Sequence, residues 1–173
     1  MNAKEIEIIT KKLYSTNSVD IMSALETIAA SGSSNLIPAL VALYGHSDNN
    51  SIKSKIENIL FNIKSPDAVP FFVEELSNCK NNTSEILLLN ACWNTGLDFS
   101  AELELFIDIF AQADFITAFE AFTVIDNTEP DLITPENAQT YLTLIQSHNS
   151  KLNSDKKALA VGMESMFEAI IST

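Results

Sequence analysis

Metal chemistry needs clustered histidines, cysteines or carboxylates, and this chain has two histidines, two cysteines and 23 acidic residues. His46 and Asp48 lie close enough in sequence to share a metal ion, but two ligands do not complete a site. The acidic stretch 126–131 lacks the turn glycine and the bidentate glutamate of an EF-hand calcium loop. We therefore expect neither a bound metal ion nor another cofactor.

Nucleophilic catalysis needs an activated thiol or hydroxyl beside a base. Cys92 is followed by Trp93, and no histidine lies near it in the sequence, which favours an inert thiol. Cys79 and Cys92 are too few for a disulfide framework, and their spacing fits no zinc-binding pattern. We interpret both cysteines as small core residues in a reducing compartment, and we expect a protein that is not an enzyme.

The beginning of the chain and its hydropathy bear on the compartment. Glu5 and Glu7 stand where a secretory signal would have a basic segment followed by an apolar one. No apolar run approaches the roughly 20 residues that span a bilayer. These features predict a cytoplasmic protein.

Charge narrows the choice of partners. The net charge is −13, there is no arginine, and between Lys80 and Lys151 eleven acids occur without one lysine. Such a surface repels phosphate, so we expect no binding to nucleic acids or to anionic membranes. Two interpretations remain open: the acids keep the protein soluble and monomeric, or they face a basic partner.

The predicted helices that carry these side chains recur in pairs at a nearly constant interval. The breaks that close the first helix of each helical pair fall near Gly32, Ser65, Gly96 and Asn127, at intervals of 33, 31 and 31. Units of about thirty residues that cannot bury their apolar faces alone are typical of α-solenoids. No window has the alternating pattern of a strand, so the predicted fold class is all-α.

The boundaries follow from apolar periodicity and from capping residues. Asp48 is the expected N-cap of one helix, and Pro66 is expected in the first turn of the next. In the fourth pair, the row Phe115, Phe119, Phe122 and Ile125 is the expected core stripe. The single predicted domain, 1–173, contains a covering helix at 2–14, repeats at 18–45, 48–79, 83–111 and 113–147, and a covering helix at 154–171.

Two of these repeats resemble a known family. The segment 48–53, followed by Ile56 and then Ile59-Leu60, resembles the aspartate-led second half of a HEAT repeat. The segments 36–40 and 68–72 are similar to the proline-containing opening of a HEAT helix. The third and fourth repeats are HEAT-like by spacing alone. The resemblance implies an α-α superhelix, a HEAT-like solenoid of about four helical pairs, which binds proteins along a concave surface.

Apolar and acidic residues remain on the second helix of the pairs after the core positions are assigned. When the repeats are aligned on Leu40, Phe72 and Phe106, the leftover apolar and acidic residues fall into neighbouring rows, because side chains four apart share a helix face. The rows predict an apolar strip with an acidic margin, suited to a basic amphipathic peptide. Alternatively, some of these residues pack against neighbouring repeats. The candidate partner-binding residues are Phe71, Glu74, Glu75, Leu105, Asp108 and Ile109.

Two functions follow as hypotheses. The first is a non-enzymatic interaction module or scaffold for a protein or peptide partner. The second is an enzyme that processes a small ligand on a HEAT-like scaffold, such as a protein similar to the bilin lyases. HEAT-like di-iron hydroxylases use several histidine–glutamate pairs, and His46 and His148 are followed by serine and asparagine instead. HEAT-like DNA glycosylases need a basic concave face, which this sequence lacks.

Overall fold

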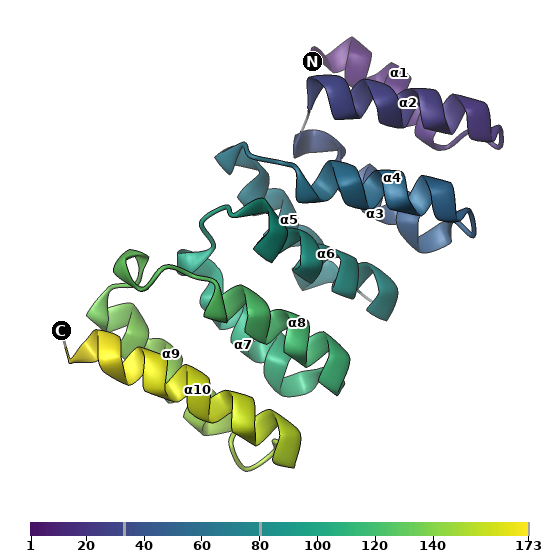
Figure 1. The fold of residues 1–173 in the computed structure, drawn as a ribbon. Coiled ribbons are helices and arrows are strands. Elements are labelled where there is room, and N and C mark those ends of the chain that lie inside the picture. The colour runs from purple at the N-terminus through teal and green to yellow at the C-terminus, as the bar shows by residue number, and fades with distance from the viewer. Residues whose placement is uncertain (33, 80, 173) are drawn as a thin grey trace. The chain divides into compact units, whose positions relative to one another are not determined.

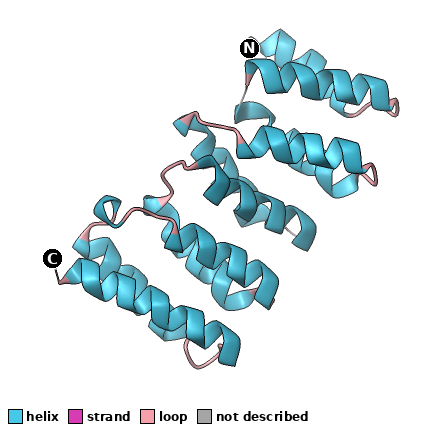
Figure 2. Cartoon of the chain, in the orientation of Figure 1, coloured by secondary structure: helices cyan, strands magenta, loops and turns pink. Residues whose placement is uncertain are grey.

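The fold is all-α in the computed structural model, which describes residues 1–32, 34–79 and 81–172. The described residues form α-helices joined by short loops, and none of them is in a strand (Figure 2). The helices are α1 (Ala3–Leu13), α2 (Ser18–Ser31), α3 (Ile37–His46), α4 (Asn50–Phe61), α5 (Val69–Asn78), α6 (Asn82–Thr95), α7 (Leu103–Gln112), α8 (Phe115–Asp126), α9 (Pro135–His148) and α10 (Ser154–Ile171).

The chain divides into two compact units, Met1–Leu97 and Asp98–Thr173. In the first unit α2, α4 and α6 pack side by side, and α1, α3 and α5 form a second layer against them (Figure 1). In the second unit α8 and α10 pack together over α7 and α9. Each layer buries the apolar face of the other, as helical hairpins must. That residues 1–173 form one solenoid domain stays a prediction.

An asparagine or aspartate begins every second helix from α2 to α8 at a nearly constant interval. Asn17, Asn49, Asn81 and Asp114 are the N-caps of α2, α4, α6 and α8, and each side chain accepts a 2.9 Å hydrogen bond from the backbone N–H two residues on. The prediction of Asp48 as a cap is wrong by one residue. The side chain of Asn49 also reaches the N–H of Ile52, so it satisfies two donors that the first helical turn leaves open.

A short 3₁₀ turn leads into the opposite layer at four places. In the second of these turns the backbone N–H of Ala68 donates to the carbonyl of Ser65, and α5 begins only at Val69. Pro66 thus occupies the first helical position after Ser65, as predicted, but this first turn is a 3₁₀ turn with the tighter i→i+3 bond. The four turns are Ser34–Leu36, Pro66–Ala68, Ser100–Glu102 and Pro130–Leu132.

The apolar stripe of α7 faces the core of the second unit. Leu103, Phe106, Ile107 and Phe110 on α7 are completely buried. They alternate with acids along the helix, so the apolar period points to one face only.

The predicted core stripe of the fourth pair is mostly wrong. Phe115 and Phe119 on α8 are 44% and 46% exposed, whereas Ala118 and Ala121 are completely buried. α8 packs closely against both α7 and α10, and small side chains allow this close approach. Because α8 has apolar residues around most of its circumference, periodicity alone could not select the inward face. Ile125 is buried as predicted.

Candidate functional site

The six predicted partner-binding residues lie on two helices. Phe71, Glu74 and Glu75 lie on α5 in the first unit, and Leu105, Asp108 and Ile109 lie on α7 in the second unit.

The α5 triplet lies beside the core of the first unit. Phe72 and Leu76 point inward and are buried, whereas Phe71 is half-buried and Glu74 is exposed. Glu75 is half-buried, and its burial, followed by the charge of Glu74, raises the pKa of its carboxyl group. Two adjacent carboxylates beside a partly exposed phenyl ring favour a cationic group over an anionic one.

The α7 triplet has a partner that sequence reasoning missed. Leu105 and Ile109 are half-buried, and Asp108 Oδ1 lies 3.0 Å from His148 Nε2 on α9. This contact links two helices across 40 residues of sequence, so no local sequence motif could predict it. Asp108 therefore has a structural contact in addition to its place at the acidic margin.

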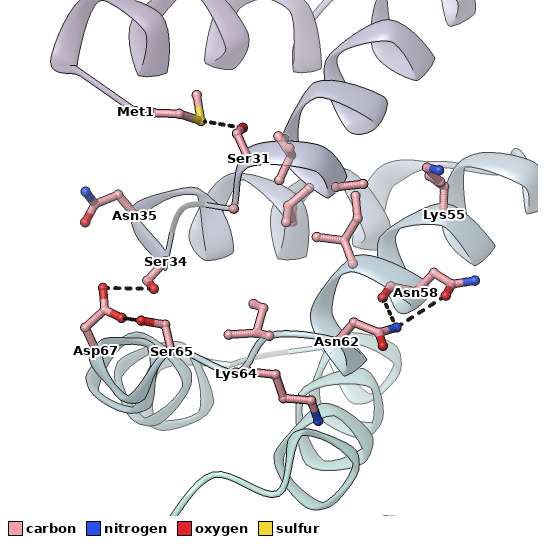
Figure 3. A pocket seen from close by; sticks show the side chains of 16 residues that line it. Met1, Ser31, Ser34, Asn35, Lys55, Asn58, Asn62, Lys64, Ser65 and Asp67 are labelled. Carbon is pink, nitrogen blue, oxygen red and sulfur yellow. Dashed lines mark hydrogen bonds between the residues drawn. The ribbon is translucent and has the colours of Figure 1, made fainter.

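A hollow of about 710 Å³ opens in the first unit. Figure 3 shows Ser34, Ser65 and Asp67 pointing toward one another on one side, opposite Asn58 and Asn62. Ser34 Oγ donates to Asp67 Oδ2 at 3.2 Å, and the Ser65 hydroxyl donates to Asp67 Oδ1. These bonds, that of Ser65 foremost, lower the pKa of Asp67. The hollow is thus lined by amides and hydroxyls that suit a polar molecule.

Two lysines that could attract anions instead donate hydrogen bonds to backbone carbonyls at the ends of helices. Lys64, at the rim of this hollow, donates through Nζ to the carbonyl of Thr95 at 2.7 Å. In the second unit Lys156 is buried and donates through Nζ to the carbonyls of Ala111 and Ala113. Cations at such positions stabilise the carboxyl ends of helices. Burial lowers the pKa of Lys156, and the charge of Asp114 partly opposes this effect.

The side chains singled out for nucleophilic or metal chemistry in the sequence are Cys92 and His46. Cys92 is 1% exposed, and burial raises the pKa of its thiol, so it cannot act as a thiolate on a ligand. His46 Nδ1 lies 2.7 Å from the carbonyl oxygen of Ala42. Residues 1–32, 34–79 and 81–172 contain no group of three or more histidine, cysteine or acidic side chains placed to hold a metal ion.

The second unit has an exposed aromatic row that sequence reasoning assigned to the core. The ring centroids of Phe115 and Phe119 are 6.4 Å apart, and those of Phe119 and Phe122 are 6.3 Å apart. Ile116, beside this row, is 64% exposed. A row of large apolar side chains on the surface marks a binding face more often than scattered single ones do.

A smaller hollow of about 370 Å³ lies at the carboxyl end of α10. Met166 and Ile170 line it from α10, and Pro130 and Ile133 line it from the loop before α9. Apart from Asp131, its lining is apolar, so it suits a hydrophobic group.

The comparisons with known proteins add no relative. No protein-family model matches the chain, and no curated protein matches it. None of the described helices has both the length and the continuous apolar character needed to cross a membrane.

Proposed function

We propose that the chain is a HEAT-like α-solenoid and serves as a non-enzymatic interaction module or scaffold for a protein or peptide partner. The regular interval of the asparagine and aspartate caps supports this proposal, as does the 3₁₀ turn that recurs between the layers. Stacked repeats leave extended helix faces for a partner, because each repeat uses only its neighbours for burial. The resemblance of 36–40, 48–53 and 68–72 to HEAT repeats points the same way.

The observation that carries the proposal is the mixture of half-buried apolar and acidic side chains on the second helices. Phe71 lies near Glu74 on α5, and Leu105 and Ile109 flank Asp108 on α7. A partly exposed apolar side chain offers a contact, and the carboxylates select a basic partner by speeding its association.

Capture from a native lysate tests this function. The wild-type chain and Glu26→Lys, a charge reversal at an exposed position of α2, are expected to retain the same stoichiometric partner. Glu74→Lys is expected to lose it. Equal capture by Glu74→Lys would move the binding face away from α5, and the absence of any stoichiometric partner would contradict the interaction function.

The hollow of about 710 Å³ favours a second candidate, a protein that binds and processes a small polar ligand. Its lining offers hydroxyls and amides, including Ser34, Asn58 and Asn62. Native mass spectrometry of the protein purified from its own cells separates the two functions. A small molecule bound at stoichiometric amounts, and lost in Asn62→Leu, would favour the ligand-processing function.

A further inference from the structure

The row of phenylalanines on α8 is not needed by the core that α8 helps to build. The inward face of this helix consists of Thr117, Ala118 and Ala121, which are all completely buried. Phe115, Phe119 and Phe122 follow at intervals of four and three residues and therefore share a face beside the inward one, exposed at Phe115 and Phe119 and half-buried at Phe122. We call Phe115, Ile116, Phe119 and Phe122, together with Val161 and Gly162 of α10, the aromatic face.

α10 presents small side chains beside the aromatic row. α8 and α10 pack side by side (Figure 1), and a Cβ atom placed on Gly162 would lie 4.0 Å from the ring of Phe122. Ala158 and Ser165, four residues before and three after Gly162, are exposed on the same side of α10. Val161 is 60% exposed. A ridge of rings beside small side chains lets the backbone of a partner helix approach closely.

The aromatic face continues toward the apolar hollow of about 370 Å³. Met166, which lines this hollow, lies four residues after Gly162 and so one helical turn along the same side of α10. A partner helix on the aromatic face can therefore place a terminal apolar side chain into the hollow. Buried apolar anchors of this kind carry most of the energy of an interface.

Charge selects among the occupants of this face. The second unit has thirteen acids and three lysines, a net charge of −10. α8 carries Glu120 and Asp126 and no lysine. α10 carries three acids and two lysines, of which Lys156 is buried against backbone carbonyls and Lys157 is exposed, so the two helices together remain negative. A second copy of the chain would bring the same negative charge to the contact, which opposes association of two copies. A segment rich in lysine or arginine would be attracted.

We propose that the aromatic face is a docking surface for an amphipathic helix of a partner protein, with an apolar row that packs on Phe115 and Phe119 and with lysine or arginine on its flanks. This inference rests on the proposed interaction function and adds a second contact surface, on α8 and α10, to the one proposed on α5 and α7. The recognition is of the helix-on-apolar-face type, in which side chains at i, i+3, i+4 and i+7 act as anchors.

A synthetic peptide tests the aromatic face directly. The probe is a fluorescent helical peptide with leucines on one face and lysines on its flanks, and its anisotropy is measured at about 0.15 M salt, where distant charges are screened. Wild type and Val19→Ser, a matched change at a 71% exposed position of the first unit, are expected to bind it equally. The double variant Phe115→Ser/Phe119→Ser is expected to bind at least about tenfold more weakly, as the loss of two anchors implies.

Three controls make each outcome decisive. A scrambled peptide of the same composition is expected to bind about tenfold more weakly than the probe, because its apolar residues no longer share one face. Thermal unfolding is expected to show a folded double variant, since Phe115 and Phe119 are 44% and 46% exposed and are not part of the buried core. Sedimentation of the wild type at increasing concentration is expected to show a monomer.

Several results would overturn the inference. Equal binding of the probe by the wild type and the double variant would mean that charge alone attracts it. Loss of binding in Glu74→Lys with retention in the double variant would place the site on α5 and leave the interaction function intact. A wild-type dimer that the double variant cannot form would make a second copy the occupant. No binding of the probe would reject this face, whereas capture from the lysate would still decide the interaction function.

Discussion

Phe71 and Phe72 are neighbours in sequence with different surroundings, because adjacent residues of a helix point about 100° apart. Phe72 is completely buried, and Phe71 is half-buried. We expect Phe72→Ala to lower the free energy of unfolding by about 3–5 kcal/mol, since it empties a core position. Phe71→Ala should cost roughly 1 kcal/mol, in proportion to the smaller apolar area removed. Urea unfolding of both variants measures the difference, and equal losses would mean that Phe71 is a core residue.

Glu75 makes a pH-dependent contribution to stability. Burial raises the pKa of its carboxyl group above the ordinary value of 4.5, so the folded state binds this proton more tightly than the unfolded state does. Stability therefore falls as the pH rises from 4.5 through the raised pKa, and the full cost is present at neutral pH. We expect Glu75→Gln to raise the melting temperature at pH 7 by roughly 1–3 °C and to lose this advantage below pH 4.5.

The control for this titration is Glu74→Gln. Glu74 is exposed, and its charge is the second cause of the shift at Glu75, after burial. Its replacement should raise the melting temperature at pH 7 less than Glu75→Gln does. The same increase for Glu75→Gln at every pH would show that packing, and not ionisation, is responsible.

At the scale of single helices, the caps offer a test of the repeat. Asn49 accepts hydrogen bonds from the backbone N–H groups of Ser51 and Ile52, whereas the adjacent Asp48 is exposed and is not the N-cap. Asn49→Ala should lower the free energy of unfolding by about 1 kcal/mol, the usual value of an N-cap. Asp48→Ala, the matched control, should change it by less than about 0.5 kcal/mol. The reverse order in chemical unfolding would restore Asp48 as the cap.

The comparison of α7 with α8 shows which parts of the fold can be predicted from the sequence. In α7 acids at Glu104 and Asp108 separate the apolar residues, so the buried face follows from the period. In α8 both alanines and phenylalanines could face the core, and the packing of α7 and of α10 against α8 leaves room there only for the alanines. That choice depends on the distance between helices, which a one-dimensional pattern does not contain.

The candidate sites also combine residues that the sequence pattern identifies with residues that only folding brings together. Phe71, Leu105 and Ile109 are half-buried, and their role in binding a partner stays a prediction. The pairing of Asp108 with His148 joins separate helices, and the hollow around Asp67 gathers residues from several elements. Their proximity is a consequence of folding, so sequence spacing could not reveal it.

At the scale of the whole molecule, charge predicts which polymers the protein avoids. Its ten lysines lie at positions 4–80 and 151–157, where Lys64 and Lys156 are bonded to backbone carbonyls. Affinity for nucleic acids comes largely from lysine and arginine that displace counterions. We expect no measurable binding of duplex DNA or single-stranded RNA at about 0.15 M salt, where the Debye length is about 8 Å. A micromolar, salt-sensitive affinity in fluorescence anisotropy would contradict this expectation.

The distribution of charge between the two units also predicts where the protein repels itself. The first unit has ten acids and seven lysines, a net charge of −3, and the second has thirteen acids and three lysines, a net charge of −10. Repulsion among like charges destabilises a compact state, and salt screens it. The melting temperature should therefore rise when sodium chloride is increased from about 0.02 M to about 0.2 M, where the Debye length becomes shorter than the unit.

Charge reversal separates this effect from a general effect of salt. Glu129→Lys in the second unit and Glu26→Lys in the first both change an exposed acid, and each shifts the net charge of its unit by +2. Because repulsion is stronger in the second unit, Glu129→Lys should raise the melting temperature at low salt more than Glu26→Lys does, and it should flatten the salt dependence. Identical curves for the two variants would mean that the excess charge of the second unit carries no energetic cost. The acids would then act only through their attraction for a partner. The peptide titration on the aromatic face would become the measurement of that attraction.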